Sequence, residues 1–161
     1  MFENIKPLSV IHLPAYAEVI RQSFATVAKD YGLTKETFPS HWSFVTNERL
    51  MEKIKDGYYP FGYFDNGNIV GFVALTDLGE GVYEMGILSV LPQKRHLGYG
   101  KALLDFCKEK VIEFGGKKIV ISLADTHDVL KNWYIANGFI HTETKIFEHV
   151  PLPVGYMEWR N

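Results

Sequence analysis

The segment LSVLPQKRHLGYGK, residues 88–101, decides the fold of this chain. Its pattern predicts a strand that ends at Pro92, a short basic loop, and a helix opened by Gly98 and Gly100. Glycine lets an anion approach the backbone closely, and the first N–H groups of a helix lack partners within it and carry the positive end of its dipole. Three cations lie nearby: Lys94, Arg95 and Lys101. The segment therefore predicts a cradle for a phosphate or pyrophosphate.

Two better-known glycine loops do not fit this segment. A dinucleotide-binding fingerprint, G-x-G-x-x-G, needs a small residue where Leu103 stands. A Walker loop needs Gly at the position of Arg95 and Ser or Thr at the position of Ala102. The two glycines are also compatible with a tightened turn that carries ordinary surface cations, so the residues alone leave both interpretations open.

Composition excludes several classes of protein. The chain has 161 residues, 47% of them hydrophobic, and its net charge is −2 from 17 Lys and Arg against 19 Asp and Glu. This length predicts a single domain over residues 1–161, and the near-neutral charge argues against nucleic-acid or membrane partners. The apolar runs are too short to span a membrane, and no secretory signal is present. One cysteine, Cys107, makes no internal disulfide, so we expect a cytoplasmic protein.

The hydrophobic pattern predicts an α/β fold. The strand at residues 82–90, the helix at 99–114 and the strand at 118–123 form a β-α-β crossover. Before it, Asn66-Gly67 predicts a tight hairpin between strands at residues 61–65 and 69–75. The other expected strands are at residues 8–13, 139–147 and 155–159, and the other expected helices are at residues 14–31, 48–55 and 129–136. This order predicts a central mixed, mostly antiparallel sheet flanked by helices.

Two motifs resemble one known family. RxxGxG at residues 95–100 resembles the acetyl-CoA signature of the GNAT N-acetyltransferase superfamily. WYIANGF at residues 133–139 is similar to the aromatic-Tyr-x-x-x-Gly-Phe motif of that family. The resemblance covers most of the chain from Phe61 onward. It implies a single-domain GNAT-like fold with a splayed sheet and acetyl-CoA as co-substrate.

The resemblance also implies how CoA binds. The sheet would open between the strands at residues 82–90 and 118–123, with the pantetheine arm paired along the first strand and the pyrophosphate on the loop amides. Gly86, in mid-strand, independently suggests a bulge. His127 stands where the family often has the Asn that contacts the arm. The cofactor-binding residues expected on this basis are Leu88, Ser89, Val90, Arg95, His96, Leu97, Gly98, Tyr99, Gly100, Lys101, His127 and Asn132.

Acetyl transfer to an amine needs a base for the amine, a donor for the oxyanion and a proton for the leaving thiolate. The resemblance makes Tyr134 the acid that protonates the thiolate, and simple packing is its alternative role. Glu84 is the candidate base, directly or through a water, and an ion-paired strand carboxylate is its alternative role. Strand alternation places Glu84, Gly86, Leu88 and Val90 on one face. A backbone N–H near Leu88 or Ser89 is the expected oxyanion donor. The six histidines show no metal-ligand spacing, so no metal is expected.

The expected function is that of an acetyl-CoA-dependent N-acetyltransferase that moves the acetyl group directly to a primary amine of a small molecule or peptide. Two alternatives are a non-catalytic acyl-CoA-binding or sensing module on the same fold and a phosphate-binding module unrelated to CoA. The acceptor pocket is expected within residues 16–59 and near residues 147–159. The first of these ranges contains the aromatic residues Tyr31, Phe38 and Trp42. Edge strands in these regions could pair two subunits, so a homodimer is a possible partner arrangement.

Overall fold

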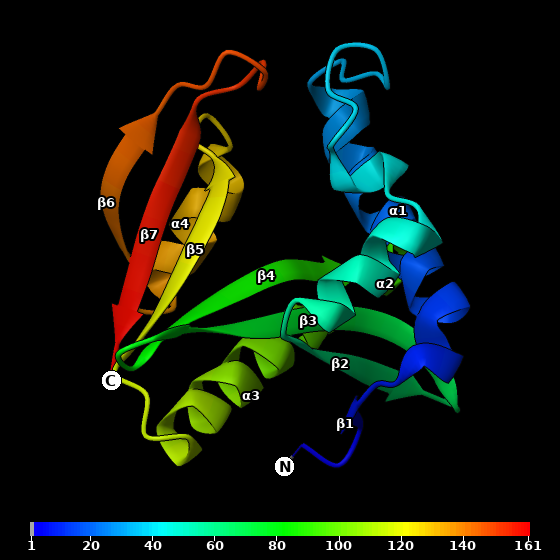
Figure 1. Ribbon diagram of the computed structural model, residues 1–161, viewed down its shortest axis with the longest axis vertical. Coiled ribbons are helices and arrows are strands. Elements are labelled where there is room, and N and C mark those ends of the chain that lie inside the picture. Colours follow the sequence, from blue (N-terminus) through cyan, green and yellow to red (C-terminus); the bar gives the residue numbers. More distant parts are fainter. Residues whose placement is uncertain (1) are drawn as a thin grey trace.

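The computed structural model describes residues 2–161, which form one seven-stranded sheet with helices on both faces (Figure 1). The strand order is β1-β2-β3-β4-β5-β7-β6. The strands are β1 (Ile5–Pro7), β2 (Tyr58–Asp65), β3 (Asn68–Gly79), β4 (Val82–Val90), β5 (Lys118–Ala124), β6 (Ile140–Lys145) and β7 (Val154–Arg160). The α-helices are α1 (Leu13–Asp30), α2 (Asn47–Lys55), α3 (Tyr99–Glu113) and α4 (Asp128–Ala136). Three 3₁₀ turns are η1 (Val10–His12), η2 (Trp42–Phe44) and η3 (Pro92–Lys94).

The sheet is mixed and mostly antiparallel, as the element order predicts. Strands β1 to β4 pair antiparallel in succession, and β5, β7 and β6 form a second antiparallel group. The hairpin predicted at Asn66-Gly67 is present, with φ of 51° and 79° at these two residues. Among the strands of the described residues, β4 and β5 form the one parallel pair, as expected for strands joined through the crossover helix α3.

The two halves of the sheet diverge where β4 meets β5. Within residues 2–161 these strands pair only from Val82 with Lys118 to Glu84 with Val120, and β4 then continues to Val90 paired with β3 but not with β5. Figure 1 shows β4 and β5 separating from this point, so that the two halves form a V. The predicted splay between the strands is therefore confirmed.

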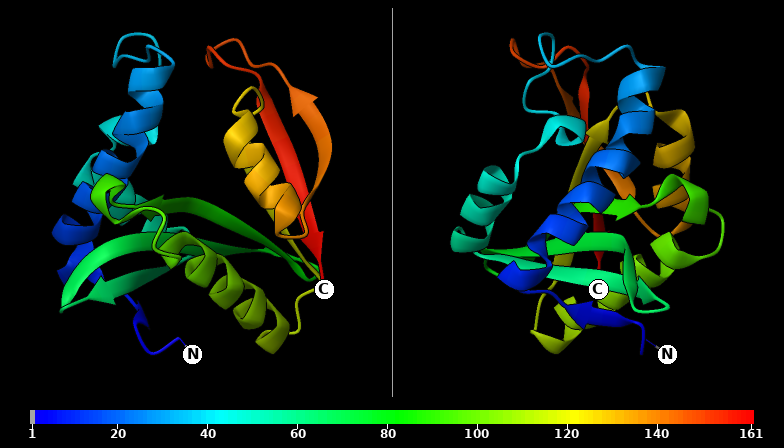
Figure 2. Two further views of the ribbon diagram at one scale, coloured as in Figure 1. Left: turned by 180° about the vertical axis from the view of Figure 1, so that it is seen from behind. Right: turned by 90° about the vertical axis from the view of Figure 1, so that its right-hand side faces the viewer.

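Two hydrophobic clusters hold the helices on opposite faces of the sheet (Figure 2). One cluster lies on the α3 and α4 face and includes Leu103, Cys107, Ile119 and Tyr134. The other packs α1 and α2 against β2, β3 and β4. We call these faces the α3/α4 face and the α1/α2 face. No helix within residues 2–161 is long and apolar enough to cross a bilayer.

The strand predicted at residues 8–13 is wrong. The first strand is β1, and residues 10–12 instead form the turn η1 that leads into α1. The Ser9 N–H donates to His12 Nδ1 at 3.0 Å, which closes this turn locally, and Ile11 is 83% exposed. Leu8 packs over Gly62 of β2, where a Cβ would lie 3.0 Å from its methyl carbons. The apolar run is thus a surface turn between two buried leucines, Leu8 and Leu13, the second of which begins α1.

Candidate active site

A bulge in β4 shapes the open edge of the splay. Phe72 of β3 pairs with Ser89 and Ala74 pairs with Gly86, so two residues of β4, Ile87 and Leu88, face a single residue of β3. Ile87 has a φ of 58°, which is rare for a β-branched residue. The bulge thus directly follows Gly86, whose mid-strand position predicts it.

The bulge changes which side chains share a face, so the predicted common face of Glu84, Gly86, Leu88 and Val90 is wrong. Tyr83 and Met85 lie in the cluster on the α3/α4 face, which leaves Glu84 and Gly86 on the α1/α2 face. A Cβ on Gly86 would lie 3.9 Å from the hydroxyl of Tyr58, which belongs to the α1/α2 cluster. Beyond the bulge, Leu88 packs on the α3/α4 side, and Val90 Cγ2 lies 3.8 Å from the Cβ position of Gly100. One extra residue in the strand has reversed the alternation.

The three predicted arm-binding residues, Leu88, Ser89 and Val90, end β4 beyond its last pairing with β5. The Ser89 side chain is 1% exposed and donates its hydroxyl to the Ile87 carbonyl at 2.8 Å. The Val90 N–H donates to Ser23 Oγ of α1 at 3.3 Å. Within residues 2–161 no strand pairs with the edge of β4 that faces away from β3 beyond Glu84, so an extended amide chain can pair with the backbone groups that Ser23 leaves free.

The loop between η3 and α3, residues 95–98, leads into a concave set of backbone N–H groups. His96 and Gly98 have positive φ values of 64° and 86°, the alternation that turns successive N–H groups toward one point. The first backbone hydrogen bond of α3 runs from the Ala102 N–H to the Gly98 carbonyl at 3.0 Å. In the described part of the chain, the N–H groups of Tyr99, Gly100 and Lys101 precede it without a protein acceptor. This geometry can receive a phosphate group.

The cations of this loop have protein partners. Lys94 Nζ lies 2.9 Å from Asp65 Oδ2, and Lys101 Nζ lies 2.8 Å from Asp105 Oδ2. The Arg95 guanidinium donates to the Ser23 carbonyl at 2.8 Å and to Thr26 Oγ1 at 3.0 Å. Asp65 and Asp105 offset the charges of Lys94 and Lys101, whereas Arg95 keeps its charge because both of its partners are neutral. The loop thus combines main-chain N–H groups with the Arg95 charge, a point that the charge pattern of the sequence does not reveal.

Tyr134 lies on α4 beneath the splay. It is 6% exposed, and its ring packs edge-on against Trp133 at 5.0 Å and Phe139 at 5.2 Å. Burial raises the pKa of its hydroxyl well above the usual value, so the group keeps its proton at neutral pH. Trp133 lies 4.0 Å from the Cβ position of Gly100, which brings the two sequence motifs together in space.

His127 and Asn132 lie at the start and in the middle of α4. His127 Nδ1 accepts the Leu130 N–H at 3.3 Å and caps the helix. Its ring lies 6.1 Å from the ring of Tyr31, which follows the end of α1 in the other half of the molecule. Asn132 is exposed. The contacts predicted for these two residues with the CoA arm stay predictions.

Glu84 belongs to a row of residues that crosses five strands on the α1/α2 face. In order across the sheet, the row is Tyr58, Thr76, Glu84, Val120 and Glu158, each paired with the next. The negative charge of Glu84 adds to burial in raising the pKa of Tyr58 to about 12. Glu158 was missed by sequence reasoning, although strand alternation over residues 154–160 places it beside Tyr156 on one face.

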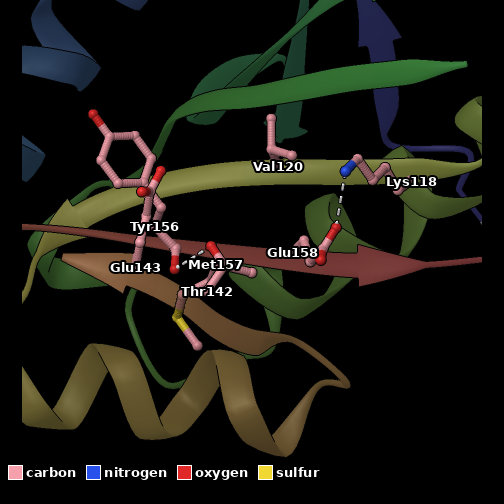
Figure 3. Close-up of a pocket in the computed structure, with 7 residues that line it drawn as sticks. All are labelled: Lys118, Val120, Thr142, Glu143, Tyr156, Met157 and Glu158. Atoms are coloured by element: carbon pink, nitrogen blue, oxygen red, sulfur yellow. Dashed lines mark hydrogen bonds and ion pairs between the residues drawn. The ribbon is translucent and has the colours of Figure 1, made fainter. Parts of the chain in front are cut away.

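A depression of about 310 Å³ adjoins this row (Figure 3). Its lining residues come from β5, β6 and β7 and are Lys118, Val120, Thr142, Glu143, Tyr156, Met157 and Glu158. Glu158 is held by Lys118 at 3.1 Å, and its side chain is 13% exposed. Because Val120 lines the depression and pairs with Glu84, the depression begins one strand away from the candidate base.

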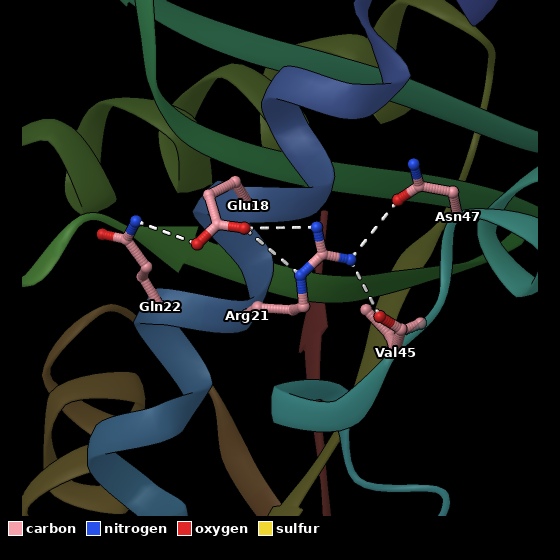
Figure 4. Close-up of polar contacts among 5 residues, drawn as sticks. All are labelled: Glu18, Arg21, Gln22, Val45 and Asn47. Atoms are coloured by element: carbon pink, nitrogen blue, oxygen red, sulfur yellow. Dashed lines mark hydrogen bonds and ion pairs between the residues drawn. The ribbon is translucent and has the colours of Figure 1, made fainter.

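The segment between α1 and α2 is fixed by polar contacts (Figure 4). Arg21 of α1 donates to the Val45 carbonyl at 3.0 Å and to Asn47 Oδ1 at 3.3 Å, and Glu18 holds its other nitrogens. Two of the aromatic residues expected at the acceptor pocket have partners here. The Phe38 ring packs on His41 at 5.3 Å, and Trp42 lies under the Arg49 guanidinium at 4.3 Å. These contacts place α2 and its cations along the α1/α2 face beside Tyr58.

Residues 25–139 match the model of the acetyltransferase (GNAT) family. The chain belongs to the GNAT acetyltransferase family. The predicted resemblance is confirmed, and the protein is an acetyltransferase. The matched region contains both motifs, the splay and Glu84.

Solved structures agree in fold with this GNAT acetyltransferase over its whole length. The ribosomal-protein-S18-alanine N-acetyltransferase from Escherichia coli has 16% identity and a TM-score of 0.77, covering 97% of this chain and 92% of that one. The PaiA N-acetyltransferase from Thermoplasma acidophilum, in complex with coenzyme A, has 20% identity and a TM-score of 0.75 over 98% of each chain. The ribosomal-protein-alanine N-acetyltransferase from Brucella melitensis has 16% identity and a TM-score of 0.74, covering 98% and 99%. At these identities the likeness is one of fold.

Proposed function

We propose that this GNAT enzyme transfers an acetyl group from acetyl-CoA directly to a primary amine, with Glu84 as base and Tyr134 as acid. The observation that carries the proposal is their placement on the two faces of the splayed sheet. Glu84 lies on the α1/α2 face beside the depression, and Tyr134 lies on the α3/α4 face beside the anion-binding loop. An amine and a thioester that meet in the splay can thus each reach the group that they need.

The donor side fits acetyl-CoA in two respects. The free N–H groups at the start of α3 suit a pyrophosphate, and the unpaired edge of β4 beyond Glu84 suits the amides of the pantetheine arm. Coenzyme A is also the ligand of the Thermoplasma PaiA structure, which shares this fold. The family of the chain and these two features together support acetyl-CoA as co-substrate.

The reaction requires one proton transfer on each face of the sheet. Glu84 accepts a proton from the acceptor amine, whose nitrogen then forms a bond to the thioester carbonyl carbon. The carbon–sulfur bond breaks, and the departing thiolate takes the Tyr134 proton. The main-chain N–H groups around the β4 bulge supply hydrogen-bond donors for the oxyanion. The raised pKa of Tyr134 suits an acid that must hold its proton until the thiolate forms.

The acceptor approaches from the α1/α2 face and binds over the depression. Its floor is aliphatic and aromatic at Val120 and Tyr156, and its rim carries charged groups of both signs. A peptide N-terminus and a small amine both match this lining, and a ribosomal protein is named as the substrate of the Escherichia coli neighbour. Both classes therefore enter the test.

The test is thiol release from acetyl-CoA with a panel of small amines and N-terminal peptides, combined with calorimetric measurement of CoA binding. The proposal expects CoA binding and release of thiol with at least one amine, and loss of release in the Glu84→Gln/Tyr134→Phe double variant. Tight CoA binding without release for any acceptor would instead identify a non-catalytic acyl-CoA-binding module. A thermal shift with nucleotides and none with CoA would identify an unrelated phosphate-binding protein.

A further inference from the structure

Asp65, the last residue of β2, contacts both ends of the anion-binding loop. Its Oδ2 lies 2.9 Å from Lys94 Nζ and accepts a hydrogen bond from the Tyr99 hydroxyl at 3.4 Å. Lys94 is the last residue of η3 and Tyr99 is the first of α3, so these two contacts flank residues 95–98. The Tyr99 ring also stacks on Tyr63 of β2 at 4.3 Å. One carboxylate on a neighbouring hairpin therefore fixes where the loop begins and where it ends.

The first residue of the loop is fixed by helix α1. The Arg95 guanidinium makes three hydrogen bonds to Ser23 and Thr26 of α1, at 2.8 to 3.3 Å. Ser23 also receives the Val90 N–H, so the end of β4 and the start of the loop share one anchor on α1. The positive-φ residues His96 and Gly98 lie between this anchor and the Tyr99 contact. The N–H groups thus point to one place because the loop is tied down at three positions.

We propose that Asp65 is a positioning residue for acetyl-CoA. It holds the loop in the shape that binds the pyrophosphate through main-chain N–H groups, and it engages Lys94, which the sequence places near the loop as a cation. This inference rests on the proposed function, because it takes acetyl-CoA as the ligand of the loop.

The two roles open to Lys94 predict opposite effects of one substitution. If Lys94 bound the phosphate directly, Asp65→Asn would remove a competing carboxylate and a repelling negative charge, and CoA would bind more tightly. If Asp65 positions the loop, the same substitution loosens both ends of the loop, and CoA binds more weakly despite the more favourable charge. The ion pair is partly exposed, so the expected weakening is about five-fold in Kd.

Calorimetric titration with CoA separates these outcomes. We expect Asp65→Asn to raise the Kd about five-fold and Lys94→Met to raise it by a smaller factor, because Lys94→Met keeps the contact of Asp65 with Tyr99. The double variant should bind no worse than Asp65→Asn, because both substitutions break the Asp65–Lys94 ion pair. Glu113→Gln is the control, since it breaks a similar ion pair, with Lys110 at 3.1 Å, at the far end of α3 from the loop, and it should leave the Kd unchanged. Asp65→Asn should weaken the binding of dephospho-CoA by the same factor as that of CoA, because the loop binds the pyrophosphate that both ligands contain.

Kinetics distinguish positioning from general destabilisation. The KM for acetyl-CoA should rise in Asp65→Asn while kcat at saturating acetyl-CoA stays the same, and Asp65→Glu should restore part of the affinity. Unchanged or tighter CoA binding in Asp65→Asn would overturn this proposal alone, provided that the wild-type protein binds CoA. Absence of CoA binding by the wild-type protein would overturn the proposed function, and this inference with it.

Discussion

Glu84 of β4 and Glu158 of β7 lie in one row on the same face of the sheet, and both pair with Val120 of the strand between them. At the usual spacing of neighbouring strands, their backbones are about 10 Å apart. Lys118 holds Glu158 at 3.1 Å, whereas Glu84 has no ion-pair partner within residues 2–161. Two carboxylates of the same kind thus differ in their partners within residues 2–161: Glu158 is ion-paired, and Glu84 lies beside the splay without an ion pair.

Replacing Glu84 tests its role as base. Glu84→Gln should lower kcat about 100-fold near neutral pH, because the acceptor amine then loses the group that takes its proton. The Kd for CoA should not change, since Glu84 lies on the other face from the loop. The deficit should shrink as the pH approaches the pKa of the amine, where the free base forms unaided, and a pH profile of kcat/KM measures this.

Glu158→Gln provides the control for that substitution, because it makes the same change in the same row of the sheet. Its kcat should stay within a few-fold of the wild-type value. Equal losses in the two variants would contradict a specific role for Glu84 and would favour an electrostatic effect of the whole face.

Tyr134→Phe tests the proposed acid. We expect a fall in kcat of roughly ten-fold, at the small end for a general acid because a thiolate is already a good leaving group. The buried ring and its contacts with Trp133 and Phe139 remain, so CoA affinity should not change. Pre-steady-state measurement of thiol release gives the rate of the chemical step, and an unaltered rate would leave Tyr134 with a packing role only.

Gly98 and Gly100 differ in the backbone conformation that they adopt. Gly98 has a φ of 86°, so Gly98→Ala should destabilise the protein by about 1 kcal/mol and weaken CoA binding by distorting the loop. Gly100 has no positive φ, and a Cβ there would make ordinary contacts at 3.8 and 4.0 Å with Val90 and Trp133. Gly100→Ala should therefore keep the stability and bind CoA within a few-fold of wild type. Thermal unfolding and CoA titration of the pair check this order, and the reverse order would mean that access to the backbone at Gly100 matters more than the loop conformation.

Local signals predicted most of the fold. Asn66-Gly67 predicted its hairpin because the turn needs positive φ at both residues, and the glycine loop predicted the start of α3 for a similar reason. The run at residues 8–13 misled, since its hydrophobicity comes partly from the exposed Ile11 and its turn is closed by Ser9 and His12. Local patterns carry no information on which apolar residue the tertiary structure buries.

The site was harder to predict because it depends on contacts between distant segments. Ile87 has a positive φ only because β3 pairs with β4 on both sides of the bulge, and that reversal of faces cannot be read from alternation. Lys94 and Arg95 stand out in the sequence as cations beside the glycine loop, yet Asp65 and Ser23, far away in the chain, engage them. The position of Glu158 in the same row as Glu84 likewise depends on the strand order, in which β7 and not β6 lies next to β5.

Buried tyrosines predict a loss of stability at alkaline pH. Tyr16 of α1 is 1% exposed and stacks on Phe72 at 4.8 Å, and burial raises its pKa to about 12. In the unfolded chain its pKa is about 10, so the stabilisation is fully present below pH 10 and is lost as the pH rises from 10 through 12. A shift of this size corresponds to about 2 to 3 kcal/mol for this one group.

Tyr16→Phe removes the ionisable hydroxyl but keeps the stacked ring, and it should therefore reduce the fall in the free energy of unfolding between pH 9 and pH 11. Urea unfolding at both pH values measures the difference, with Tyr59→Phe as the control, because Tyr59 is 51% exposed. Equal alkaline losses in the wild type and in Tyr16→Phe would show that the Tyr16 hydroxyl ionises in the folded protein as readily as in the unfolded chain.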